Sequence, residues 1–158
     1  MSPLDRARLL AALVPAGLLA GAHGSQSLGG LHPCAMCYWQ RWPHFAALGL
    51  ALLSFALIHR LPDRGRSLVW LAALAIVTSG AIGVYHVGVE LDIFEGFTQC
   101  AGGGGTSVAD ILSAPVISCE DIQWSLLGVS MAGWNALVSL LFGTLILWLS
   151  LKRPSTRT

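Results

Sequence analysis

Four cysteines are the residues of this chain whose type and spacing could do chemistry. Cys34 and Cys37 form a C-x-x-C pair, and Cys100 and Cys119 lie farther along the chain. A C-x-x-C disulfide closes a very small loop, so it gains little stability from chain entropy. The same spacing is common in pairs that exchange electrons. The first pair is therefore a candidate redox centre, and inert disulfide staples are the alternative for both pairs.

Zinc binding is another chemistry that four cysteines suggest. Zinc ribbons use two short C-x-x-C knuckles, whereas here only Cys34 and Cys37 are closely spaced. This spacing disfavours zinc, and we expect no metal site.

A single cation stands beside the C-x-x-C pair. Arg41 follows Cys37 by four residues, and a helix would place both side chains on one face. In that position Arg41 would favour nearby anions, such as the Cys37 thiolate or a reduced oxygen on a bound cofactor. The alternative is an interfacial arginine whose side chain snorkels to water.

The elements that must position these residues are apolar. The chain is 54% hydrophobic and 11% charged, with a mean hydropathy of +0.68, whereas about a quarter of the residues in soluble domains are charged. We therefore expect an integral membrane protein. Four apolar stretches can each cross a hydrocarbon core of about 30 Å as a helix, the second only with its flanks. They cover about residues 9–30, 43–58, 67–89 and 126–151. A removable signal peptide is disfavoured for the first stretch, because no clean small-residue cleavage site follows it.

The distribution of basic residues predicts the topology. Eight of the nine Lys and Arg residues fall in three segments, before the first stretch, between the second and third, and after the fourth. They are Arg6, Arg8, Arg60, Arg64, Arg66, Lys152, Arg153 and Arg157. The positive-inside rule makes these segments and both termini cytoplasmic. The outer loops, at about 31–42 and 90–125, then hold the cysteines on the side where disulfides persist.

Together these features predict the fold class. We expect an all-α integral membrane protein in which four transmembrane helices form an up-down bundle with two outer loops, as one membrane domain over residues 1–158. In the second outer loop a glycine run follows Cys100, and Val108, Ile111 and Leu112 have the spacing of a short surface helix. His86 lies at the outer end of the third stretch.

Several motifs carry a resemblance to a known family. "HPCAMCYWQRWPHF", "YHVGVE", the two later cysteines and "WSLLGVSMAGWN" follow one another in this order and resemble the bacterial disulfide bond formation protein B (DsbB) family. The resemblance implies a protein-dithiol:quinone oxidoreductase of the bacterial inner membrane. Such a protein reoxidises a soluble periplasmic DsbA-like oxidase and passes the electrons to a membrane quinone. We expect ubiquinone rather than menaquinone, contact with membrane lipid, and no nucleic-acid partner.

The resemblance also implies roles for residues on the quinone side. Cys34 and Cys37 would be the pair beside the quinone, and Cys37 would contact it. Arg41 matches the quinone-site arginine of the family, and His86 matches a histidine near the ring.

On the partner side, Cys100 would be attacked by the partner's thiolate, and Cys119 would be its disulfide mate. A quinone reductase of the vitamin K epoxide reductase type is an alternative, although its loop cysteines precede the C-x-x-C, whereas here they follow it. A non-catalytic membrane protein stapled by disulfides is a second alternative, which bound quinone and thiol turnover would exclude.

Overall fold

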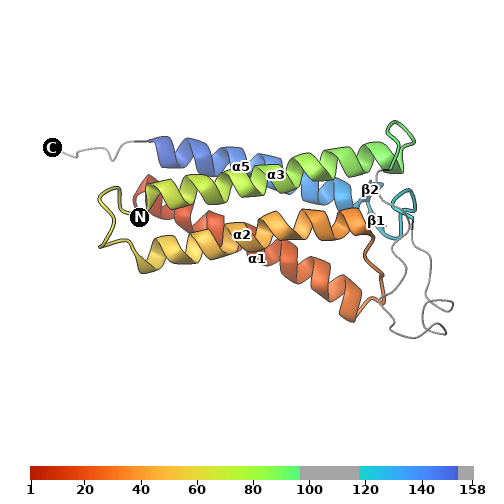
Figure 1. The fold of residues 1–158 in the computed structure, drawn as a ribbon, viewed down its shortest axis with the longest axis horizontal. Helices are drawn as coiled ribbons and strands as arrows, with labels where there is room; N and C mark the ends of the chain where they lie inside the picture. The colour runs from red at the N-terminus through yellow and green to blue at the C-terminus, as the bar shows by residue number, and fades with distance from the viewer. Residues whose placement is uncertain (97–117, 153–158) are drawn as a thin grey trace.

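The structure is a computed structural model that describes residues 1–96 and 118–152. Four long helices in this part of the chain lie side by side (Figure 1), and a two-residue hairpin precedes the last of them. The helices are α1 (Pro3–Ser27), α2 (Ala35–Ala56), α3 (Arg66–Glu90) and α5 (Met131–Leu151), and the antiparallel strands are β1 (Ser125–Leu126) and β2 (Val129–Ser130). The predicted all-α fold is thus confirmed.

Three of the described helices are long and apolar enough to cross a membrane. They are α1, α3 and α5, with 25, 25 and 21 residues and mean hydropathies of 1.3, 2.0 and 1.8. The 22 residues of α2 are also long enough, but polar side chains such as Gln40, Arg41 and His44 lower its hydropathy.

The surface of the bundle is apolar and its interior is rich in small residues. Large side chains are exposed on the outside, among them Trp42 at 70% and Leu141 at 64%, which is the pattern of a surface that meets lipid rather than water. The buried cluster between the helices is instead dominated by alanines: Ala7, Ala11, Ala47, Ala51, Ala72 and Ala73. Small residues let transmembrane helices approach closely.

Helices α3 and α5 approach each other closely at glycine positions. A Cβ atom on Gly83 would lie 3.0 Å from the carbonyl oxygen of Ala132, and one on Gly143 would lie 2.6 Å from Cγ2 of Val77. A larger residue at Gly83 would press on the backbone of α5, and one at Gly143 would displace the side chain of Val77. The close packing fixes α5 against the helix that carries His86.

The helix boundaries differ from the predicted stretches in ways that matter for the site. Helix α2 begins at Ala35, before the predicted start at 43, and it continues through Pro43. Cys37 and Arg41 therefore lie in its first two turns rather than in a loop. Helix α1 begins at Pro3, so Arg8 lies within the helix instead of before it. Residues 125–130 form the hairpin, and α5 starts only at Met131.

The bundle has two ends with different chemistry. One end carries the connection between α2 and α3 with Arg60, Arg64 and Arg66, and we call it the basic end. The opposite end carries Cys34 and the hairpin (Figure 1), and we call it the cysteine end. Cys100, the glycine run after it and the predicted surface helix lie outside the described residues, as do Arg153 and Arg157.

Candidate functional site

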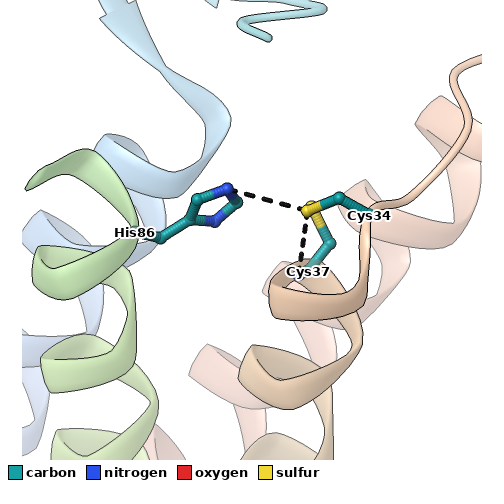
Figure 2. A group of neighbouring side chains, drawn as sticks. All are labelled: Cys34, Cys37 and His86. Carbon is teal, nitrogen blue, oxygen red and sulfur yellow. Dashed lines mark hydrogen bonds between the residues drawn. The ribbon is translucent and has the colours of Figure 1, made fainter. Parts of the chain in front are cut away.

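The thiol pair is built on the first turn of α2. Cys34 caps the helix, and its Sγ accepts a hydrogen bond from the backbone N–H of Cys37 at 3.3 Å. The two sulfurs lie 2.9 Å apart and are not joined by a disulfide in the structure (Figure 2). The hydrogen bond with Cys37, followed by burial, raises the pKa of the Cys34 thiol, which precedes the helix. A thiolate formed by this pair therefore lies on Cys37, at the positive end of the helix dipole.

His86 reaches this pair from α3. Its Nε2 atom lies 3.6 Å from Sγ of Cys34 (Figure 2) and 4.0 Å from Oε1 of Glu90, whose other oxygen accepts a hydrogen bond from Ser130. The resemblance predicted His86 near a quinone ring, and the structure places it beside the sulfur of Cys34. The ring also lines a cavity together with Cys37 and Arg41.

Cys34, Cys37 and His86 form the only group of possible metal ligands found among the described residues. Ligand atoms of Cys34, Cys37 and His86 all lie within 4.8 Å of one another. Structural zinc sites use four protein ligands, and no fourth Cys, His, Asp or Glu from the described ranges joins this group. The arrangement is therefore incomplete as a structural zinc site.

Cys119 lies beside the thiol pair, although it is distant in sequence. It is buried in one cluster with Cys34, Met36 and Val89. The structure thus brings three of the four predicted cysteines together at the cysteine end.

Arg41 is buried, with 7% of its surface exposed. Its Nη1 donates to Oε1 of Gln26 at 2.9 Å and its Nη2 to the carbonyl oxygen of Ala22 at 3.2 Å, both on α1. The guanidinium lies 5.2 Å from the ring centre of Tyr38. All these partners are neutral, and no carboxylate of the described residues forms an ion pair with Arg41. Its charge therefore remains available to an anion.

Cys37 and Arg41 stand between two cavities. The first, which we call the polar cavity, is also lined by Cys34, His86 and Glu90. The second, which we call the apolar cavity, lies between α1, α2 and α5. Its other lining residues are Leu18, Leu19, Ala22, Gln40, His44, Met131, Ala132, Trp134 and Asn135.

A buried polar network that the sequence reasoning missed extends from His86 into the bundle. Gln40 Nε2 lies 2.8 Å from Nδ1 of His86, Asn135 Nδ2 donates to Oε1 of Gln40 at 2.7 Å, and Asn135 Oδ1 lies 2.9 Å from Nε2 of His44. Polar side chains inside apolar helices are expensive and often functional. That signal was present in "QRWPH" and "GWN" and could have found these residues.

Two closely spaced thiols stand beside an arginine that has no acidic partner among the described residues, in a helical bundle with an apolar surface. This arrangement fits a membrane-embedded thiol redox protein. The comparison with protein families agrees with this class. The family model described as "Disulfide bond formation protein DsbB" matches residues 5–149, and the chain belongs to this family.

Individual relatives support the assignment. The chain is 32% identical to disulfide bond formation protein B of Marinobacter nauticus, over 92% of this chain and 90% of the relative. It is 32% identical to the protein of the same name from Methylococcus capsulatus, with 92% and 94% covered. It is 33% identical to disulfide bond formation protein B of Xanthomonas oryzae pv. oryzae, over 80% of this chain and 78% of the relative. No solved structure matches at comparable significance.

Family membership confirms the predicted resemblance and the general function. The chain is a membrane protein of disulfide bond formation, from a family of thiol oxidoreductases that uses quinone. It also decides against the vitamin K epoxide reductase type.

Proposed function

We propose that this chain reoxidises a soluble DsbA-like dithiol oxidase and passes the electrons to ubiquinone through Cys34 and Cys37. The observation that carries the proposal is the position of the pair: Cys34 packs with Cys119, while Cys37 lines the apolar cavity with Arg41. The pair therefore lies between the cysteine that belongs to the partner side and a cavity that suits a lipid-soluble ring.

The residues of the apolar cavity fit a quinone. Its wall is mainly aliphatic and aromatic, with Leu18, Leu19 and Trp134 among the lining residues, and such a wall suits an apolar ring. An arginine has five N–H donors, so Arg41 keeps donors beyond its bonds to Gln26 and Ala22. When bound, the quinone supplies the capacity to accept two electrons.

The chain's own cysteines would carry the electrons in two exchanges. The partner's thiolate attacks Cys100 of a Cys100–Cys119 disulfide, and a second partner thiol resolves the mixed bond, leaving both loop cysteines reduced. The Cys119 thiolate then attacks Cys34 of the Cys34–Cys37 disulfide, which releases the Cys37 thiolate beside Arg41. Cys100 then attacks Cys119 in the Cys119–Cys34 bond. This step reforms the Cys100–Cys119 disulfide and leaves Cys34 and Cys37 reduced. Each exchange moves one electron pair and forms one disulfide for each one broken.

The energetics explain why a quinone is needed. DsbA has a potential of about −120 mV, against about −180 to −270 mV for ordinary redox-active C-x-x-C proteins. Moving two electrons to a pair some 90 mV lower costs roughly 4 kcal/mol. A strongly oxidising acceptor must offset this cost, which is the reason to propose ubiquinone over the less oxidising menaquinone.

The proposal includes a topology. All four helices would span the bacterial inner membrane as one domain over residues 1–158, with both termini cytoplasmic and the cysteine end periplasmic. The gathering of Arg60, Arg64 and Arg66 at the basic end supports this orientation through the positive-inside rule.

The test is steady-state turnover of purified protein with a reduced DsbA-like protein and ubiquinone. We expect turnover by the natural chain and none by Cys34→Ala, with Arg60→Lys as a matched surface control that keeps full activity. Full turnover by Cys34→Ala would contradict the relay. Repeating the assay with menaquinone compares the two quinones as electron acceptors.

A trapping experiment tests the order of the cysteines. A partner variant that keeps only its attacking thiol cannot resolve its bond to Cys100 with a second thiol, so a mixed disulfide through Cys100 should accumulate. Peptide mapping identifies the bond. Trapping at Cys34 instead would reverse the assignment of the two pairs.

A further inference from the structure

His44 lies in α2 on the same face as the proposed site. It follows Arg41 by three residues and Cys37 by seven, which places the three side chains on one helical stripe. All three line the apolar cavity. His44 is 3% exposed, and no role was assigned to it above.

The surrounding hydrogen bonds fix the orientation of Asn135, the main partner of His44. Asn135 Nδ2 donates to Oε1 of Gln40 at 2.7 Å and to the carbonyl oxygen of Ser79 at 3.2 Å. Both of these atoms only accept hydrogen bonds. The amide group of Asn135 must therefore face them, and its oxygen Oδ1 faces Nε2 of His44 at 2.9 Å.

The same neighbours fix the tautomer of His44. Because Oδ1 of Asn135 can only accept, Nε2 of His44 carries the hydrogen and donates it. Ser79 Oγ, also 2.9 Å from Nε2, donates its own hydrogen to the carbonyl oxygen of Gln40. Ser139 Oγ, at 3.4 Å, donates to Oδ1 of Asn135. Every group around Nε2 is thus an acceptor, so in the neutral imidazole Nδ1 carries no hydrogen and can only accept a hydrogen bond.

Nδ1 of His44 is a buried atom without a hydrogen-bond partner among the described residues. Buried polar atoms in native proteins are nearly always paired, because an unpaired one costs free energy. In a side chain that lines a cavity, such an atom points to a ligand that brings a donor. Arg41 is the complementary group in the same cavity, since it only donates.

We propose that Nδ1 of His44 is the second polar contact of the quinone cavity and accepts a hydrogen bond from a ring hydroxyl; this inference rests on the proposed function. A quinone carries carbonyl oxygens, which offer Nδ1 no donor. The hydroquinone carries hydroxyl groups, and one of them satisfies Nδ1. His44 therefore makes the cavity prefer the reduced ring, whereas Arg41 serves an oxygen of either form.

Binding measurements test this preference without relying on turnover. Isothermal titration gives the Kd of a short-chain ubiquinone for the oxidised protein and of its hydroquinone for the reduced protein, two pairings in which no electrons move. In His44→Phe, which keeps a ring but no acceptor, we expect the hydroquinone Kd to rise roughly tenfold, the effect of one lost hydrogen bond. The quinone Kd should stay within about twofold. His44→Gln offers an amide oxygen and should lose less, and His59→Gln, on the exposed turn of the basic end, should change neither Kd.

A ligand series keeps the test independent of how well a variant folds. The natural chain should bind the hydroquinone roughly tenfold more tightly than its dimethyl ether, which accepts from Arg41 but has no hydroxyl for His44. Equal binding of the two, or equal changes of both Kd values in His44→Phe, would overturn this inference alone. Failure of the natural chain to bind either form of the quinone would overturn the proposed function, and this inference with it.

Discussion

The two ends of the bundle each bury an arginine, and the two arginines are held in different ways. Arg8, at the basic end, is 1% exposed and donates to Oδ1 of Asp5 at 3.1 Å, to Oγ of Ser54 at 3.1 Å and to the carbonyl oxygen of Arg64. One of these partners is a carboxylate, so the charge of Arg8 is balanced within the protein. Arg8 joins α1 to α2 and to the connection that follows α2.

Arg41, toward the cysteine end, contacts only neutral partners in the part of the chain that the structure describes. It donates to Gln26 and Ala22 and lies over Tyr38, but none of these groups balances its charge. It also lines both cavities, next to Cys37. The difference teaches that burial alone does not separate a structural arginine from a functional one. In this structure the two arginines are distinguished by whether a carboxylate is bound to the guanidinium.

The largest effect on stability is expected at the basic end. Arg8→Ala removes three hydrogen bonds, one of them to the buried Oγ of Ser54, so the free energy of unfolding should fall by about 3 kcal/mol. Unfolding in mixed detergent measures it. The KM for quinone should not change, because Arg8 contacts neither cavity. A loss below about 0.5 kcal/mol, the usual effect at an unimportant surface site, would remove Arg8 from its structural role.

The effect of Arg41→Lys should appear in binding rather than in stability. Lysine keeps the charge but lacks the planar fork of donors. We expect the apparent KM for quinone to rise by a factor of roughly ten to a hundred, corresponding to the loss of one charge-assisted hydrogen bond of about 1.5–3 kcal/mol. Insertion and oxidation of the cysteines by small-molecule oxidants should be unchanged. Steady-state kinetics with Arg60→Lys as control decide this, and an unchanged KM would make Arg41 an interfacial anchor.

A smaller effect concerns the two thiols beside Arg41. Because the pKa of Cys34 is raised above that of an ordinary thiol, this thiol keeps its proton at neutral pH and is a poor nucleophile there. Cys34 is also buried, whereas Cys37 is partly exposed. Brief treatment of the reduced protein with iodoacetamide should therefore label Cys37 first, as peptide mass spectrometry would show. Faster labelling of Cys34 than of Cys37 would contradict the assignment of the thiolate to Cys37.

The sequence predicted the parts of the site that depend on local spacing. Cys37 and Arg41 share a helical face because they are four residues apart, and the apolar stretches predicted the helices. The position of Arg8 was not predicted, because a basic residue beside an apolar stretch reads as a flanking charge. Only the docking of α1 against α2 shows that it reaches Ser54.

The polar network could not be predicted for a related reason. His44 and Asn135 are 91 residues apart in sequence, and their contact depends on the rotation of α2 and α5 about their own axes. Similarly, the packing of Cys119 against Cys34 depends on the path of the chain after α3. Neither rotation nor path has a signal in local residue spacing.

The central claim is that Cys34 and Cys37 deliver electrons to a quinone in the cavity beside Arg41. A single-turnover experiment with the Cys100→Ser, Cys119→Ser variant tests it most directly, because only this thiol pair remains. The reduced variant is mixed with ubiquinone without oxygen, and the hydroquinone and the remaining thiols are quantified together. We predict one hydroquinone formed for each Cys34–Cys37 disulfide. If the quinone stays oxidised while a small-molecule oxidant still forms that disulfide, the claim is contradicted.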